Sequence, residues 1–318
     1  MNSESPENGS ISIMALESGV KYETLDEAPD VPLLIELLGI RPTDLAKLSQ
    51  RFSIDIEDLQ DVQDLDERSR LQIEDKYTII LLRVPVDLRV KDRQYSTIPT
   101  AVFTNGRDII IIQNEDIPMR KPRVRQKVHL STTAADIVYR WWEIIIHAFE
   151  TTLDIIETTI NETEDVIMRE MYPSQLEWFF QLSRDAIFIE AALKSNMKVL
   201  QRLEQTHALG KLMLDVNRLE ELEVDLQQQT ELSAIYRELI DNAMNAYDSM
   251  VGHNLNRAIK TLTSISLLVS VPTLIASVYG MNIELPLREN ILAFPIIMVL
   301  SFAISLSLLL LLRRKSLV

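Results

Sequence analysis

The chain has 318 residues, a formal net charge of −15 and a mean hydropathy of +0.04, so a very polar part must be offset by a very apolar part. Cysteine is absent, which excludes disulfide frameworks, thiolate metal sites and cysteine nucleophiles. Neither G-x-G-x-x-G nor G-x-x-x-x-G-K-[ST] occurs, which excludes nucleotide binding by those motifs. We therefore expect no nucleotide partner. The acidity argues against a basic nucleic-acid surface, so we expect no nucleic-acid partner either, and it favours a cationic one.

The first part of the chain predicts an α/β domain over residues 10–130, after a polar, disordered stretch at 1–9 that lacks the features of a signal peptide. Segments rich in β-branched residues predict three strands, at 76–86, 95–104 and 108–113. Asn105-Gly106 lies between the last two and predicts a hairpin. Short helices are expected at 32–38 and 43–52.

From residue 131 onward the pattern is helical. Ser131 is a candidate N-cap for a helix that ends near Tyr172-Pro173, and a second helix is expected over about 174–205. Together they form a predicted helical hairpin at 131–210. A single long helix is then expected over 211–280, on the order of 100 Å in length, and such a helix needs partners along its flank.

Two stretches near the C-terminus, 261–283 and 290–312, contain no charged residue. Each is long enough for the ~20 residues that cross a bilayer core, so we expect spans at about 261–280 and at 291–312, a loop at 281–290 and a basic tail at 313–318. The alternative is a pair of buried core helices, for which the loop is too short. Basic residues flank the hairpin at Arg257, Lys260, Arg313, Arg314 and Lys315, which predicts a plasma-membrane protein with both termini in the cytoplasm.

The polar residues of the first span form a heptad stripe on one helix face. Its members are Thr263, Ser266, Ser270, Thr273 and Ser277, and the register extends to Gly280 in one direction and through Ile259, Asn256, Gly252, Ser249, Asn245 and Asn242 in the other. Close helix packing is one explanation, because small residues are favoured at membrane interfaces. The other is a water-filled pore in a ring of identical subunits, which also explains why asparagines continue the stripe beyond the span.

Tyr279-Gly280-Met281-Asn282 stands at the end of the first span. A Y-G-M-N sequence at this position, followed by a short loop and a last span with basic residues after it, resembles the CorA family of magnesium and cobalt transporters. The resemblance covers essentially the whole chain, strongly over 254–315 and in outline before that.

The resemblance implies a funnel-shaped homopentamer in the lipid bilayer, with an α+β cytoplasmic domain (a small αβα sandwich plus long helices) followed by the two-helix transmembrane hairpin. Gly280, Met281 and Asn282 would then form the outer mouth of the pore. The pore-lining residues would be Asn256, Ile259, Leu262, Thr263, Ser266, Ser270, Thr273 and Ser277, with Ile259 and Leu262 as an apolar constriction. Two departures stand out. Several relatives carry a larger apolar residue where Ser270 stands, and the outer loop lacks the M-P-E-L often seen in the family, which leaves Glu284 as the nearest outer acid.

Many members of this family close when cytoplasmic Mg²⁺ fills carboxylate sites between subunits. By rough register, Asp87 would supply one side of such a site and Glu221 the other, with Glu223 and Asp225 beside it. Carboxylate oxygens suit Mg²⁺, but a solvated acidic surface is an equal alternative. A second acidic stripe, of Glu150, Asp154, Glu157, Asn161 and Glu164, is either a cation-concentrating surface or the wet face of a helix.

The predicted function is therefore influx of Mg²⁺, and of Co²⁺ as a further substrate, through a homo-oligomeric channel that Mg²⁺ also regulates. A zinc transporter of the same superfamily is one alternative, although Met281 favours Mg²⁺ and Co²⁺. A membrane-anchored scaffold without conduction is another. An enzyme is not expected, because no nucleophile–base pair or metal-ligand spacing is present.

Overall fold

The computed structural model describes residues 10–90, 93–114, 133–167, 173–206, 216–281 and 292–314; within these ranges the side chains at 87–90, 93–95, 162–167, 173–176, 178, 216 and 293 are left out. The chain divides into two compact units, Met1–Ala243 and Met244–Val318. One helix, α6 (Val216–Tyr279), contributes to both. We describe each unit by itself.

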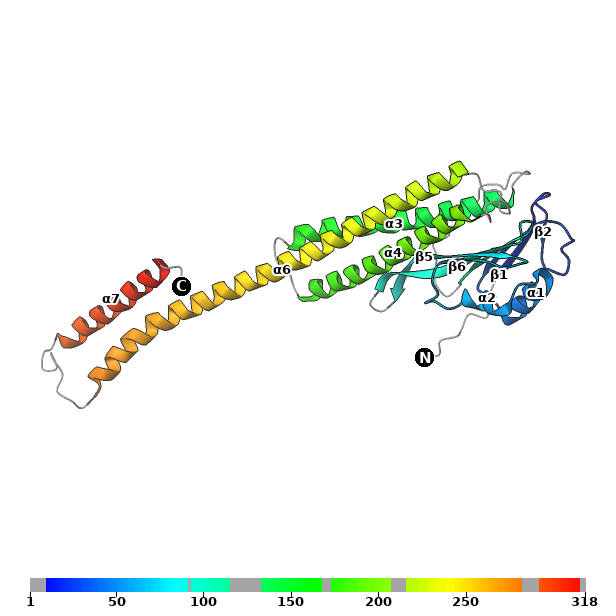
Figure 1. Ribbon diagram of the computed structural model, residues 1–318. Coiled ribbons are helices and arrows are strands. Elements are labelled where there is room, and N and C mark those ends of the chain that lie inside the picture. The colour runs from blue at the N-terminus through cyan, green and yellow to red at the C-terminus, as the bar shows by residue number, and fades with distance from the viewer. Residues whose placement is uncertain are drawn as a thin grey trace. The chain divides into compact units, whose positions relative to one another are not determined.

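The first unit is built on a seven-stranded mixed sheet in the order β2-β1-β3-β7-β6-β5-β4, in which only β3 and β7 pair in parallel among the described strands (Figure 1). The strands are β1 (Ser10–Ala15), β2 (Lys21–Tyr22), β3 (Leu33–Leu38), β4 (Arg70–Ile73), β5 (Thr78–Val90), β6 (Arg93–Thr104) and β7 (Ile109–Gln113). The three predicted strands correspond to β5, β6 and β7, and the Asn105-Gly106 hairpin joins β6 to β7 in antiparallel register.

The prediction of a helix at 32–38 is wrong. Residues Leu33–Leu38 form β3, a strand inside the sheet between β1 and β7. Leucine and isoleucine side chains of β3 are buried on both of its faces. The periodicity of a short apolar segment of this kind does not distinguish a strand from a helix. The second predicted helix is present as α1 (Pro42–Phe52), and α2 (Ile56–Asp61) follows it.

The main core lies between one face of the sheet and the helices α1 and α2. It includes Ile35, Ile79, Phe103 and Ile110 of the strands and Leu48 of α1, all almost fully buried. On the other face, α3 (Ala134–Ile167) packs against β5, and α4 (Pro173–Gln205) packs against β4, β5 and β6. Helices therefore cover both faces, which confirms the expected sandwich with long helices.

Asn196 attaches α4 to the sheet. Its side-chain amide donates to the carbonyl oxygen of Arg83 at 2.8 Å, and its carbonyl oxygen accepts from the Arg83 backbone N–H at 3.0 Å and from the Ser69 hydroxyl at 2.7 Å. Asn196 is fully buried, so each of these bonds satisfies a group that water cannot reach. The Asn196 side chain thus holds α4 to the middle of β5 through a pair of hydrogen bonds to the Arg83 backbone, like the pair that a neighbouring strand would make.

The N-terminal part of α6 lies with α3 and α4 in the first unit. The Tyr236 hydroxyl donates to Glu157 of α3 at 2.9 Å, and Arg237 pairs with the buried Glu190 of α4 at 2.6 Å. Burial alone would raise the pKa of Glu190, but the hydrogen bonds from Lys194 and Arg237 lower it below its usual range. These contacts join the three long helices into a bundle beside the sheet.

Thr133 caps α3. Its hydroxyl accepts from the backbone N–H of Asp136 at 3.2 Å, and the Asp136 carboxylate accepts from the Thr133 backbone N–H at 2.9 Å. This reciprocal pair has the form of a capping box, with Asp in the place of Glu or Gln. The predicted cap, Ser131, lies outside the described residues.

Acid should remove a contribution of Asp136 to stability. The Arg218 guanidinium, 2.6 Å away, and the Thr133 groups lower the pKa of Asp136 to about 2 from the ordinary value of 3.8. A lowered pKa stabilises the folded state above the unfolded value, and this contribution disappears as pH falls toward 2. We expect Asp136→Asn to destabilise the protein at pH 5 and to have little effect near pH 2, measured by denaturant unfolding at both pH values. The control is Glu143→Gln, on the exposed face of α3, whose effect on the free energy of unfolding should not depend on pH in this way. If Asp136→Asn lowers the free energy of unfolding equally at both pH values, the assignment is contradicted.

Candidate functional site

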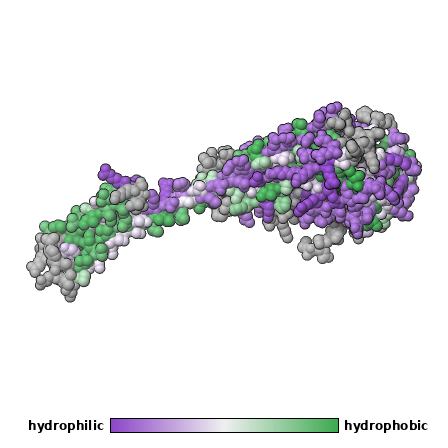
Figure 2. Space-filling model, viewed as in Figure 1, coloured by the Kyte–Doolittle hydropathy of each residue, from purple (hydrophilic) through white to green (hydrophobic). Residues whose placement is uncertain are grey.

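The second unit contains two described helical segments: α6 from Met244 to Tyr279, which is free of charged residues from 261 onward, and α7 (Ala293–Arg314), which is apolar. The most apolar windows of α6 and α7 have mean hydropathies of 1.8 and 2.6, and each helix is long and apolar enough to cross a membrane. Figure 2 shows hydrophobic residues gathered over α7 and the C-terminal part of α6. The α7 helix extends about 32 Å, close to the ~30 Å of a hydrocarbon core.

The predicted stripe lies on one side of α6 and is open to the surroundings in the single chain. Asn256, Ile259, Leu262, Thr263, Ser266, Ser270, Thr273 and Ser277 are all exposed. Ile259 and Leu262 expose 51% and 67% of their surface, although both are aliphatic. A single chain therefore leaves both the polar stripe and the apolar pair uncovered.

The threonine hydroxyls of the stripe donate to their own helix. Thr263 donates to the carbonyl oxygen of Ile259 at 2.8 Å, and Thr273 donates to that of Val269 at 2.7 Å. Further along the register, Ser249 donates to the carbonyl oxygen of Asn245 at 3.0 Å. A hydroxyl has one hydrogen and two lone pairs, so each of these oxygens remains available to accept. Acceptors in a row suit the hydrogen atoms of a cation's water shell.

A different face of α6 meets α7. Ser301 and Ser305 of α7 are each 1% exposed, in a unit whose side chains are otherwise largely open. Ser264, Leu267, Val271, Ile275 and Tyr279 of α6 are half-buried and recur at helical spacing. Because α6 is the other described helix of this unit, we assign the contact to these two rows. Small residues are favoured where membrane helices pack against each other. Sequence reasoning missed this pair, although Ser-x-x-x-Ser in an apolar segment is a visible signal.

The C-terminal end of α6 contains hydrogen bonds that span three residues instead of four. The Gly280 N–H donates to the carbonyl oxygens of Ala276 at 3.0 Å and Ser277 at 3.1 Å, and the Met281 N–H donates to that of Val278 at 3.2 Å. A Cβ at Gly280 would lie 3.3 Å from the Ser277 oxygen, a tight contact. Gly280 and Met281 are both exposed here. Asn282 and the nearest outer acid, Glu284, lie outside the described residues.

The predicted regulatory residues lie on two elements. Asp87 is on β5, where its backbone pairs with Tyr95 just before a shift in register, and its side chain is outside the described part. Glu221 and Asp225 are exposed on α6, and Glu223 is half-buried beside Gln201. Within the described residues, no three His, Asp or Glu side chains come close enough to share a metal ion.

Glu221 has a partner in its own chain. The Tyr139 hydroxyl of α3 donates to its carboxylate at 3.0 Å. Burial, together with this bond, raises the pKa of Tyr139 to about 12. The hydroxyl therefore stays protonated at neutral pH and orients one carboxylate oxygen, which leaves the other oxygen for a further contact. This tyrosine was not among the predicted site residues.

The second acidic stripe follows the wet side of α3. Glu150, Asp154 and Glu157 are exposed, and Glu157 accepts the Tyr236 hydroxyl described above. The side chain of Glu164 is outside the described residues. The position of these acids accords with a solvated helix face.

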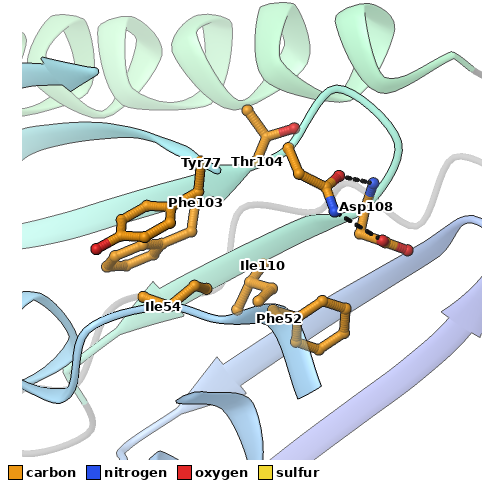
Figure 3. A pocket seen from close by; sticks show the side chains of 8 residues that line it. Phe52, Ile54, Tyr77, Phe103, Thr104, Asp108 and Ile110 are labelled. Atoms are coloured by element: carbon orange, nitrogen blue, oxygen red, sulfur yellow. Dashed lines mark hydrogen bonds between the residues drawn. The ribbon is translucent and has the colours of Figure 1, made fainter. Parts of the chain in front are cut away.

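A small pocket lies in the first unit beside the β6–β7 turn (Figure 3). Phe52, Ile54, Tyr77, Phe103 and Ile110 line most of it, and Asn105 closes the turn through two hydrogen bonds with Asp108. None of the predicted site residues lines this pocket, and its polar groups are paired within the fold.

These features define a class: a membrane protein with a mixed α/β domain, a long helix that contributes to that domain and to a span, and a second span at the C-terminus. Residues 36–314 match the family described as CorA-like Mg²⁺ transporter protein, and the chain belongs to this family. The family consists of transporters.

Two relatives are described as cobalt/magnesium transport protein CorA. The protein of Methanocaldococcus jannaschii is 23% identical over 281 residues, which cover 85% of this chain and 86% of the relative. That of Thermotoga maritima is 21% identical over 270 residues, 80% of this chain and 74% of the relative. The complete structure of the CorA magnesium transporter from M. jannaschii has the same fold, with a TM-score of 0.78 at 21% identity over 96% of this chain and 97% of that one.

Proposed function

We propose that copies of this chain assemble around the stripe of α6 into a channel that admits Mg²⁺ and Co²⁺ to the cell. The observation that carries the proposal is the row of exposed hydroxyl and amide side chains along a helix long and apolar enough to span a membrane. Membership of a Mg²⁺ transporter family supports the choice of cargo. The description of the M. jannaschii relative as a cobalt/magnesium transport protein supports Co²⁺ as a second substrate.

Assembly is favoured because the polar stripe of a single chain in the membrane would otherwise face lipid. A hydroxyl or amide group that faces lipid loses its water, at a cost of about 2–7 kcal/mol when nothing compensates. The bonds of Thr263 and Thr273 to their own helix offset only part of this cost along the stripe. Five copies, the number implied by the resemblance, would enclose Asn256 and Ser266 in a shared aqueous space. The row of half-buried residues from Ser264 to Tyr279 is engaged with α7, so the stripe remains the free polar side for this role.

Neutral oxygens suit this cargo. Mg²⁺ gives up its waters reluctantly, so a pore that holds the water shell avoids the cost of dehydration. Without a carboxylate in the span, binding stays weak enough for release. A membrane potential of about 100 mV supplies roughly 4.6 kcal/mol per divalent cation that moves inward, twice the value for one charge. No nucleotide is then needed to drive uptake.

Ile259 and Leu262 would form the gate. Both side chains are exposed on α6 within one helical turn of each other. A ring of such residues narrows an aqueous pore to an apolar collar, which can close by losing its water. At the other end of the span, Gly280, Met281 and Asn282 would form the mouth, with amide oxygens of Asn282 receiving the hydrated ion.

Orientation follows from the basic residues around the spans. Arg257 and Lys260 precede the first span, while Arg313, Arg314 and Lys315 follow the second. Positive residues concentrate on the cytoplasmic side. Both termini would therefore lie in the cytoplasm of a plasma-membrane protein, with the loop 281–290 outside.

Regulation would use carboxylates from neighbouring copies, Asp87 of one copy and Glu221 of the next, with Glu223 and Asp225 nearby. The Tyr139 hydroxyl that holds Glu221 would fix the direction of its carboxylate. Mg²⁺ between copies would hold the assembly closed when the internal concentration is high.

Removing both sides of this site should weaken regulation. We expect Asp87→Ala with Glu221→Ala to raise the internal Mg²⁺ concentration that half-inhibits uptake by about tenfold, since loss of carboxylate ligands removes the charge that holds the ion. The measurement is Mg²⁺ uptake into proteoliposomes preloaded with graded Mg²⁺. Glu220→Ala, an exposed acid next to Glu221, is the matched control and should leave the midpoint unchanged. If the double variant is half-inhibited at the same internal Mg²⁺ concentration as the parent, these residues do not form the regulatory site.

Flux measurements test the function itself. Proteoliposomes that contain the full chain should take up Mg²⁺ and Co²⁺ without nucleotide, at a rate that increases with an inside-negative potential. Direct competition between Mg²⁺ and Zn²⁺ separates this function from zinc transport. Absence of flux for every divalent cation would instead favour a membrane-anchored scaffold.

A further inference from the structure

A groove runs along α6 beside the predicted pore lining, with Leu262 of that lining at its border. It is lined by Asn254, Arg257, Ala258, Thr261, Leu262 and Ile265. Its composition changes along the helix: an amide and a guanidinium stand at one end, and aliphatic side chains form the other. At 100° per residue, the groove positions other than Leu262 lie on average about 160° around α6 from the stripe at the same level.

The polar end of the groove lies at the edge of the membrane. Arg257 precedes the end of α6 at Tyr279 by about 33 Å of helix, and Arg314 follows the start of α7 at Ala293 by about 32 Å. Both lengths match one hydrocarbon thickness of ~30 Å. The basic ends of the two helices are therefore at the same depth, and Ile265 lies about 12 Å deeper than Arg257, at the level of acyl chains.

The charged residues at this membrane depth are positive. The sequence contains no Asp or Glu at 249–283 or at 290–318, while Arg257, Lys260, Arg313 and Arg314 are all cationic. Basic pockets between membrane helices on the cytoplasmic side attract anionic lipid headgroups, at about 1 kcal/mol per Lys or Arg near the surface. A cation above an aliphatic groove is complementary to a phosphate above an acyl chain.

We propose that this groove binds an anionic phospholipid of the inner leaflet, with its phosphate on Arg257 and an acyl chain along Ala258 and Ile265. The outward direction of the groove rests on the proposed function, in which the opposite side of α6 lines the pore. The lipid would cover an aliphatic surface of α6 that α7 leaves open.

Tryptophan fluorescence can test this site directly, because the native tryptophans, at 141, 142 and 178, all belong to the first unit. The reporter is Ile265→Trp in the groove, and Val299→Trp on the exposed side of α7 is the reporter control. Full-length protein is reconstituted into vesicles with dibrominated phosphatidylglycerol or dibrominated phosphatidylcholine as the quencher.

We expect the groove reporter to prefer phosphatidylglycerol over phosphatidylcholine by about fivefold, the factor that corresponds to one basic group near an anionic surface. Arg257→Gln should abolish the preference, whereas Lys260→Gln, a charge at the same depth outside the groove lining, should leave most of it. The α7 reporter should be quenched by both lipids alike.

Equal quenching of the groove reporter by both lipids, or an equal effect of Arg257→Gln and Lys260→Gln, would overturn the proposal. Quenching of the α7 reporter but not of the groove reporter by either lipid would mean that a second copy of the chain covers the groove. None of these readings depends on ion flux. A chain that binds the lipid but does not conduct would refute the proposed function alone.

Discussion

Replacing Asn282 with alanine should reduce selective Mg²⁺ uptake by at least about tenfold. The amide oxygens of Asn282 would contact the hydrated ion where it enters the pore, and a hydrogen bond to a charged group contributes about 1.5–3 kcal/mol. In an assembly each copy loses its amide at once, so the ring disappears as a whole. The measurement is initial Mg²⁺ uptake into proteoliposomes, with Ca²⁺ and Zn²⁺ competition to report selectivity.

Asn290→Ala provides the matched control, because Asn290 is another asparagine of the segment that joins the two spans. It should conduct as the parent does. If the Asn282 variant takes up Mg²⁺ at the parent rate and with parent selectivity, the mouth of the pore lies elsewhere. If both variants fail equally, the loop is required for folding rather than for ion entry.

The second large effect is expected at the contact between α6 and α7. Ser305→Leu places a bulky side chain where 1% of the serine surface is exposed, and overpacking of this kind costs about 1–3 kcal/mol. Its hydroxyl also donates to the Ser301 carbonyl oxygen at 3.0 Å, a bond that leucine cannot make. The protein should unfold at a lower temperature in detergent, and reconstituted flux should fall with it.

Ser307→Leu separates packing from hydropathy. Ser307 is two residues away on the same helix, and its side chain is exposed. The same substitution there should change stability by no more than about 0.5 kcal/mol, as for exposed positions in general. A Ser307→Leu variant that is destabilised as much as Ser305→Leu would show that the buried serines do not form the contact we assign to them.

Periodicity and turn residues predicted much of the fold. The Asn105-Gly106 turn placed the β6–β7 hairpin correctly, because only a few residue types accept the backbone of such a turn. The long helices and both span-length segments followed from uninterrupted patterns. Pro32 and the apolar run after it were misread as a helix, because burial on both sides of β3 removes the alternation that marks a strand. The position of Asn196 depended on a contact 113 residues away in the chain, which no local pattern encodes.

The candidate site divides in a similar way. The stripe from Asn256 to Ser277 could be read from spacing, and the structure places these residues on one exposed side of α6. Ser301 and Ser305 were overlooked, because serines in an apolar segment resemble tolerated polar residues until a partner helix buries them. Asp87 and Glu221 lie on separate elements of one chain, and the partnership predicted for them involves neighbouring copies, so it stays a prediction.

The hydroxyl hydrogens of Thr263 and Thr273 are already engaged in hydrogen bonds, and this affects which ions such a pore would exclude. An anion such as chloride is solvated by donors, and each of these hydroxyls has already given its hydrogen to the carbonyl oxygen four residues earlier. At these two positions only the oxygen remains toward the pore, and it repels chloride and accepts hydrogen bonds from the water shell of a cation. Part of the charge discrimination would then come from the direction of hydrogen bonds in a helix that carries no charge in its span.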